Sequence, residues 1–210
     1  MAAAQGTREV GEGESEGVSL SFRILGEVHR ALKAELGPYL GAVEPGVGLS
    51  CGPLGDLDSE APRINLFFHE VQLNKNGARG RPTVRARGDR GGDGDDFTFH
   101  PPPLELALRF LVTATAADPG EALEALGRAL HFFQEHPRLL LGEGGEDGEA
   151  IPLTPDPDLD GERIAAIFRA HRAVPQLSVG YLTRVELHST KVLRRAAATR
   201  SVSHRIRRPG

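Results

Sequence analysis

The chain has 210 residues, of which 39% are hydrophobic, enough for one domain with a buried core. No apolar run approaches the roughly 20 residues of a membrane helix, and the first residues lack the apolar core of a signal peptide. The single cysteine, Cys51, excludes an internal disulfide and suits a reducing cytoplasm, so we expect cytoplasmic synthesis and assembly.

Charge is distributed unevenly along the chain. Seven basic residues and no acidic residue follow position 190, although the whole chain has a net charge of −4. The seven are Lys191, Arg194, Arg195, Arg200, Arg205, Arg207 and Arg208. This pattern predicts either a basic arm over residues 191–210 that binds a partner or a solvated, flexible end. We take the seven as candidate partner-binding residues and expect one domain over residues 19–190.

The first part of the sequence predicts a disordered segment followed by a helix. Residues 1–18 are small, acidic and rich in glycine, which predicts disorder. From Ser19 to Leu40, apolar residues recur at helical spacing and predict an amphipathic helix whose end frays at Gly37-Pro38. The repeating residues are Leu20, Ile24, Leu25, Val28, Leu32, Leu36 and Leu40. Residues 41–62 are rich in Gly, Pro and Asp and predict a loop.

Apolar and alternating segments predict three strands in the middle of the chain. Ile64 to Leu73 is β-prone and is followed by a predicted turn at 74–77, where Asn and Gly tolerate positive φ. Residues 77–96 predict a long loop, and Phe97 to Phe99 a short strand. After three prolines, apolar residues alternate from Leu104 to Thr113, which predicts a strand with one buried face.

A capped helix follows that strand. Asp118 is a predicted N-cap, Pro119 suits the first helical position, and Glu121 can reach back as a capping-box acid. Pro137 is expected to end the helix. Its predicted buried face consists of Ala122, Leu123, Leu126, Leu130 and Phe133.

The remaining residues predict an acidic loop at 142–149, a short helix at 162–170 and a final strand. The inner face of that strand is predicted to hold Val179, Tyr181, Thr183, Val185 and Leu187. The expected order is helix, strand, strand, helix, short helix and strand. This order predicts a single α+β domain with a mostly antiparallel sheet packed by helices.

One motif resembles the start of a calcium-binding EF-hand loop but fails at its end. Asp156, Asp158 and Asp160 have the required spacing, yet position twelve, which needs a bidentate Glu, is Ile167. An N-cap and turn before the short helix explain the three acids better.

Other chemical motifs are incomplete or absent. Residues 91–96 match half of one calcium-binding nonapeptide, and a single copy cannot stack into a β-roll. His131 and His136 lie five residues apart and do not share a helix face. The sequence has no Gly-x-Ser-x-Gly elbow and no phosphate-binding glycine loop, and Cys51 has no basic neighbour in sequence. We therefore expect no enzymatic activity, no cofactor or metal, and no small-molecule substrate.

Three collinear blocks resemble one known family. They are Pro62-Arg-Ile-Asn-Leu-Phe-Phe-His-Glu-Val71 with the turn after it, Pro102-Pro103-Leu104 to Ala114 with the helix through Pro137, and Pro175 to Ser189. Together they resemble the tail-terminator or cap proteins of extracellular contractile injection systems, a family with a phage-tail-terminator-like N-terminal domain. Departures include Phe110 in place of a usual Tyr and Phe168 in place of a usual Trp, which are core-type exchanges.

The resemblance implies a phage-tail-terminator-like fold and a mechanical function. Such proteins form a six-fold ring that closes the inner tube and the last sheath ring and stops their polymerisation. The implied partners are further copies in a hexameric ring, the sheath protein and the inner tube protein. The chain would then be part of a phage-tail-like particle, which can be released, and its basic arm would bind sheath or a neighbouring cap subunit.

Two alternatives from other classes stay open. A nucleic-acid-binding protein would use the basic arm, but the arm lacks interleaved aromatic residues and the rest of the chain is acidic, so we do not expect nucleic acid as a partner. A small enzyme would assemble its site from scattered residues, and a deep pocket with converging polar groups would favour it.

Overall fold

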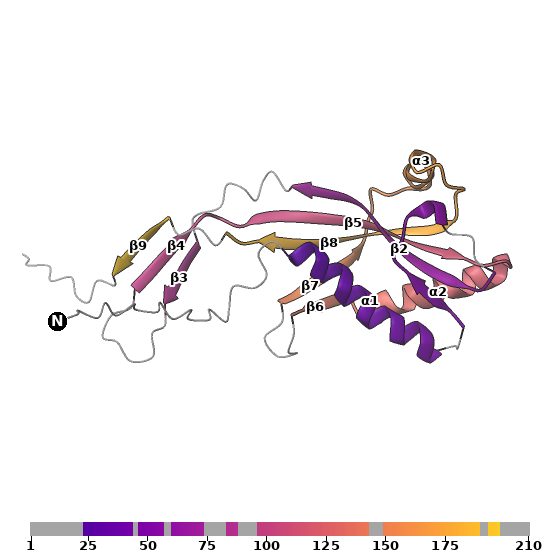
Figure 1. The fold of residues 1–210 in the computed structure, drawn as a ribbon, viewed down its shortest axis with the longest axis horizontal. Coiled ribbons are helices and arrows are strands. Elements are labelled where there is room, and N and C mark those ends of the chain that lie inside the picture. Colours follow the sequence, from indigo (N-terminus) through magenta and orange to yellow (C-terminus); the bar gives the residue numbers. More distant parts are fainter. Residues whose placement is uncertain are drawn as a thin grey trace, which may run out of the picture.

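The computed structural model describes residues 23–43, 46–56, 60–73, 83–87, 96–142, 149–189 and 193–197 (Figure 1). The helices are α1 (Ile24–Val43), α2 (Pro119–Glu135), α3 (Gly161–Ala170) and the short 3₁₀ helix η1 (Leu54–Asp56). The strands are β1 (Gly48–Ser50), β2 (Arg63–Leu73), β3 (Thr83–Arg87), β4 (Asp96–His100), β5 (Leu104–Thr115), β6 (Arg138–Leu141), β7 (Glu149–Pro155), β8 (Leu177–Leu187) and β9 (Arg194–Ala197).

Six of these strands form the main sheet in the order β1-β2-β5-β8-β7-β6. Only the β1–β2 pair is parallel, and the other neighbours are antiparallel. The three longest strands, β2, β5 and β8, lie side by side, with Phe68 opposite Phe110 and Phe110 opposite Tyr181. The predicted α+β class with a mostly antiparallel sheet is confirmed.

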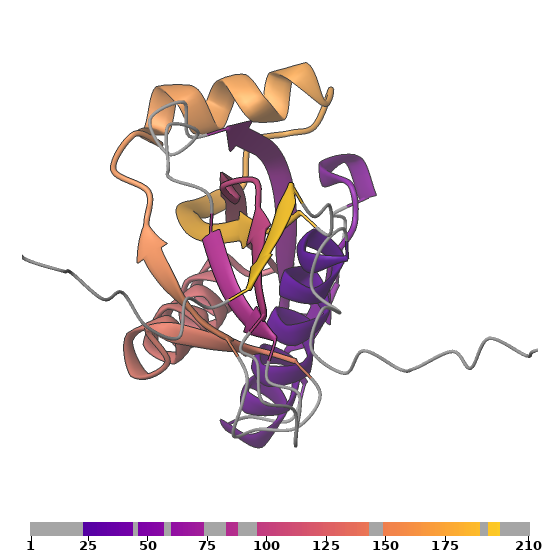
Figure 2. The ribbon, with the colours of Figure 1, turned by 90° about the vertical axis from the view of Figure 1, so that its left-hand side faces the viewer.

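Helices cover both faces of the main sheet. Helices α1 and α2 pack on one face and α3 lies on the other, as Figure 2 shows end-on. The larger core lies under α1 and α2 and centres on Phe110, whose ring lies near those of Phe68, Phe133 and Tyr181. The smaller core lies under α3 and joins Leu54, Leu111 and Phe168, all of which are buried.

The remaining strands form a small sheet that extends from one end of the main sheet (Figure 1). Its order, β3-β4-β9, repeats the order of β2-β5-β8, because each strand of the small sheet is joined in sequence to its counterpart in the main sheet. The three prolines at 101–103 separate β4 from β5, since proline has no N–H to donate to a strand ladder. We call β3, β4 and β9 the extension.

Helix α1 differs from the prediction at its C-terminal end. It continues through Gly37 and Pro38 to Val43, although proline removes one helical hydrogen bond. The turn beyond Pro38 is held by tertiary contacts, because Leu40 is fully buried and Tyr39 packs against α2. This packing outweighs the unfavourable local sequence.

Several segments predicted as loops, or not assigned, contain short strands. Residues 41–62 include β1 and η1, residues 77–96 include β3 and the start of β4, and the hairpin β6–β7 follows α2. These strands have three to seven residues, too few for a clear alternation, and β1 contains a glycine. Strands β1, β6 and β7 are stabilised by pairing with longer neighbours, whereas β3 and β4 pair with each other.

The buried face of α2 is rotated relative to the prediction. Leu123 is 59% exposed, whereas the small residues Ala125 and Ala129 are fully buried. Alanine allows the helix to approach the sheet closely, while Phe132 and Phe133 fill the space at its end. The predicted buried position of Leu123 is therefore wrong.

Other local predictions are confirmed. The Asp118 carboxylate accepts hydrogen bonds from the backbone N–H groups of Gly120 and Glu121 at 2.7 and 3.1 Å, and the helix ends just before His136. Asp160 caps α3 through the N–H of Arg163 at 2.9 Å. The return bond from Glu121 stays a prediction. The segment 1–18 predicted to be disordered, the predicted turn at 74–77, and most of the predicted loops at 83–96 and 142–149 lie outside the described residues.

Alanine substitutions at two glycines are expected to have opposite effects on stability. A Cβ added at Gly180 would lie 2.5 Å from Cδ1 and 2.7 Å from Cβ of Leu159, whereas a Cβ at Gly127 would meet nothing within 4 Å. We expect Gly180→Ala to lower the free energy of unfolding by about 1–3 kcal/mol through overpacking. Gly127→Ala, in the middle of α2, should raise it by about 0.5–1 kcal/mol. Urea unfolding of both variants checks this, and equal effects would contradict it.

Candidate assembly surfaces

The structure places two of the seven predicted partner-binding residues, Arg194 and Arg195, in strand β9. They stand opposite Phe99 and Thr98 of β4, and the Leu193 N–H donates to the Phe99 carbonyl at 2.7 Å. Residues 194–197 are thus the third strand of the extension. Lys191, Arg200, Arg205, Arg207 and Arg208 lie outside the described residues. The boundary at residue 190 and the binding role of all seven stay predictions.

A group of charged side chains joins the sheet to the segment that precedes α3. Arg109 on β5 binds Asp156 through Nη1 and Asp158 through Nη2, each at 2.8 Å, and its Nε lies 3.8 Å from Glu70. The Asp156 side chain has no exposed surface, and that of Arg109 is 13% exposed. The backbone N–H of Asp158 also donates to Asp156 at 3.0 Å. We call these four residues the Arg109 cluster.

The Arg109 cluster explains the acids that resemble an EF-hand start. Asp156 and Asp158 bind an arginine, and Asp160 caps α3, so none of the three is left for a cation. Hydrogen bonding and attraction from Arg109 lower the pKa of Asp158 below its usual value. The arginine partner could not be predicted from the sequence, because Arg109 occupies an outward position of an alternating strand, where a charged residue is ordinary.

His69 lies at the β-bulge of β2, near the same charges. Its Nε2 is buried and has no hydrogen-bond partner among the described residues. Burial lowers its pKa from the ordinary 6.5, against the opposing effects of Glu70 and Asp156. The nearby Arg109 and His171 side chains lower the His69 pKa further.

This environment predicts a pH-dependent stability. Below pH 6.5 the unfolded chain takes up a proton at His69 that the folded chain does not, so the free energy of unfolding should fall as the pH drops through that value. His69→Gln should reduce the slope between about pH 6.5 and 5. Urea unfolding of both proteins across this range measures the difference, and identical slopes would contradict the prediction.

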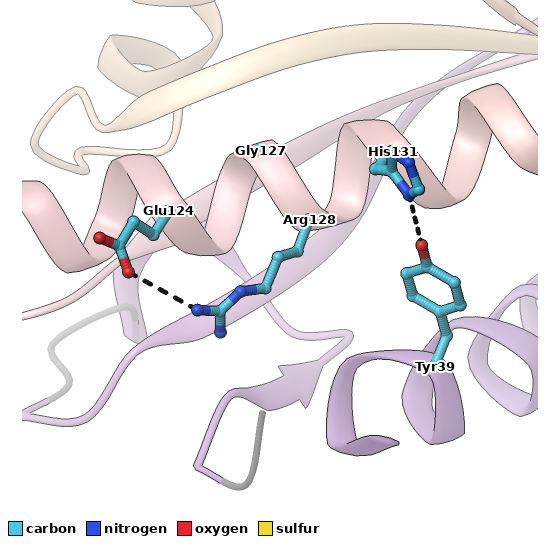
Figure 3. Close-up of a pocket in the computed structure, with 5 residues that line it drawn as sticks. All are labelled: Tyr39, Glu124, Gly127, Arg128 and His131. Carbon is cyan, nitrogen blue, oxygen red and sulfur yellow. Dashed lines mark hydrogen bonds and ion pairs between the residues drawn. The ribbon is translucent and has the colours of Figure 1, made fainter. Parts of the chain in front are cut away.

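A shallow depression of about 320 Å³ lies beside α2, where Tyr39 reaches across from α1 (Figure 3). It is lined by Tyr39, Glu124, Gly127, Arg128 and His131. The Tyr39 hydroxyl donates to Glu135 at 2.9 Å and lies 2.6 Å from His131 Nδ1. Because the hydroxyl has one proton and gives it to the carboxylate, His131 Nδ1 must be the donor in the shorter contact. These bonds join α1 to α2.

The polar groups of this depression bind one another. Removal from water and the Glu135 carboxylate raise the pKa of Tyr39, so its hydroxyl stays protonated at neutral pH. Across the described ranges, no three His, Cys, Asp or Glu side chains are grouped so that they could hold a metal ion. None of the helices described is both long and apolar enough to cross a membrane. Because Tyr39 on α1 contacts His131 and Glu135 on α2, the depression lies at a contact between the two helices.

Exposed apolar side chains gather where the main sheet meets the extension. Val71 and Leu73 at the end of β2 are 54% and 56% exposed, and Leu104 at the start of β5 is 43% exposed. All three share the helix-covered face of the sheet, because Val71 pairs with Leu108 and Leu73 with Leu106. We call these three residues the junction patch.

Comparison with known proteins gives one family and two similar structures. The Pvc16 N-terminal domain model matches residues 27–199. One similar structure is the sheath/tube terminator, in its extended state, of the extracellular contractile injection system PVC. It is 16% identical to this chain with a TM-score of 0.60, and the match covers 89% of this chain and 64% of the terminator. The tube-terminating cap of the anti-feeding prophage is 13% identical with a TM-score of 0.53, covering 86% and 59%. No curated protein matches the chain.

Proposed function

Because the chain belongs to the Pvc16 N-terminal domain family, we propose that it is a structural cap of a phage-tail-like contractile injection system. It closes the inner tube and the last sheath ring and stops their polymerisation. The observation that carries this proposal is the likeness of 86–89% of the chain to two proteins described as terminators. The chain spans less than two thirds of either terminator. We therefore assign the activity of those whole proteins to this chain as a proposal.

The architecture suits assembly into a closed ring. A ring requires a heterologous contact, in which one face of each copy meets a different face of the next. The molecule offers such unlike surfaces, with two helices on one face of the main sheet and the extension at one end of it (Figure 1). We propose six copies, with the sheath protein and the inner tube protein as further partners.

The chemistry of the described residues also favours a structural role. Charged and polar side chains in the Arg109 cluster and beside α2 bind each other and connect elements of the fold. We propose that the chain is not an enzyme and has no small-molecule substrate. It is made and assembled in the cytoplasm and becomes part of the particle. The seven basic residues beyond position 190 bind sheath or a neighbouring cap subunit.

A polymerisation assay tests the capping function. Sheath and tube proteins are assembled with and without the full chain, and particle lengths are measured by electron microscopy. We expect added chain to shorten the particles and to block further growth when fresh subunits are supplied. Unchanged lengths and continued growth would contradict the proposal. A salt-sensitive DNA affinity with no effect on length would favour the nucleic-acid alternative.

A deletion tests the basic arm. Removing residues 191–210 also removes β9, so a matched deletion of residues 198–210 separates the arm from the extension. We expect the shorter deletion to leave thermal unfolding unchanged and to weaken capture of sheath in a pull-down. Sheath capture equal to that of the intact chain would contradict a role for the arm.

A further inference from the structure

Among the described residues, no strand pairs with the outer edge of β2 next to the junction patch. Strand β1 pairs with β2 only through Arg63–Asn65, and the Leu66 amide lies against Cys51. Beyond the bulge at Phe68/Glu70, residues 70–73 pair with β5 on one side and with no described strand on the other. An open strand edge with exposed apolar side chains can accept another strand.

The two faces of this edge differ in chemistry. Val71 and Leu73 lie on the helix-covered face and are more than half exposed. Glu70 lies on the opposite face with 48% of its side chain exposed, and Gln72 shares that face. A strand that fits here needs apolar residues on one side and basic residues on the other.

The segment after β9 has this pattern. In residues 201–207, Val202, His204 and Ile206 alternate with Ser203, Arg205 and Arg207, so a strand would present two apolar side chains and a histidine on one face and two arginines on the other. Residues 198–210 contain four arginines and no acid. Their charge and periodicity complement the edge beside Glu70.

The position of β9 favours binding of the segment after it to a second copy over binding to the β2 edge of the same copy. Strand β9 runs away from the main sheet and ends at Ala197, at the far end of the extension (Figure 1). The C-terminal end of β9 therefore lies away from the β2 edge of the same copy. We propose that residues 201–207 of one copy add a strand to residues 70–73 of a second copy, covering its junction patch. This inference rests on the proposed ring and names one of its contacts.

Self-association of the full chain tests the inference. Val71→Asp should raise the concentration of half-association at least about ten-fold, because a buried carboxylate would replace an apolar contact. Val174→Asp is the matched control, since Val174 is 74% exposed and lies in the segment between α3 and β8. It should change that concentration less than about two-fold. Sedimentation velocity measures association, and thermal unfolding verifies that each variant folds.

A double variant tests whether the two segments form one contact. Deletion of residues 198–210 should weaken self-association as much as Val71→Asp does. The combined variant should associate no more weakly than either single variant, because both changes remove the same interaction. Additive effects, normal association of Val71→Asp, or a wild-type chain that stays monomeric would overturn the inference. The capping assay on Val71→Asp separates the two proposals: normal capping with unchanged association would refute this contact and leave the proposed function standing.

Discussion

Replacing Arg109 with leucine is expected to lower the free energy of unfolding by about 3–5 kcal/mol, because it leaves a buried carboxylate without its charged partner. Asp156 has no exposed side-chain surface, and Arg109 holds it at 2.8 Å. After the substitution, the N–H of Asp158 at 3.0 Å is the hydrogen-bond donor that remains for the Asp156 carboxylate among the described residues. Urea unfolding of the wild type and of Arg109→Leu measures the loss.

Two further variants separate the buried ion pair from the rest of the Arg109 cluster. Asp158→Asn removes an exposed partner and should leave the free energy of unfolding nearly unchanged, because solvent screens that ion pair. The double variant Arg109→Leu/Asp156→Leu should recover much of the loss, since no unpaired charge remains buried. A loss under about 1 kcal/mol for Arg109→Leu would contradict the role assigned to this pair.

Replacing Phe110 with alanine is expected to lower the free energy of unfolding by about 3–5 kcal/mol. Its side chain is fully buried, and its ring centroid lies 5.0 Å from that of Phe68 and 5.9 Å from that of Tyr181. These residues stand on the three central strands of the main sheet. The cavity would therefore weaken the contacts that hold those strands together.

Thermal and urea unfolding of Phe110→Ala measure this effect. The matched control is Leu123→Ala, because Leu123 is largely exposed on α2 and its loss should change stability by less than about 0.5 kcal/mol. Similar losses for both variants would contradict the placement of Phe110 at the centre of the core.

Sequence patterns predicted the elements with strong local signals. Strand β5 alternates over ten residues, and α2 has Asp118 and Pro119 at its start, so both were located within one or two residues. The resemblance to the tail-terminator family, which rested on these segments and their neighbours, is confirmed by the family match over residues 27–199.

The remaining features depend on contacts between distant residues. The short strands β1, β6 and β7 exist because longer strands provide partners, and α1 passes Pro38 because Leu40 is buried beyond it. The Arg109 cluster joins residues 47 and 49 positions apart. The junction patch could not be predicted, because its leucines and valine follow the same alternation as buried core residues.

We propose above all that this chain caps tubes as a ring of identical copies. Electron microscopy of the full chain mixed with assembled tube and sheath tests it most directly, with class averages taken along the particle axis. We expect density with six-fold symmetry at one end of the particles. Particles with bare ends, and a chain that remains free or binds along their sides, would contradict it.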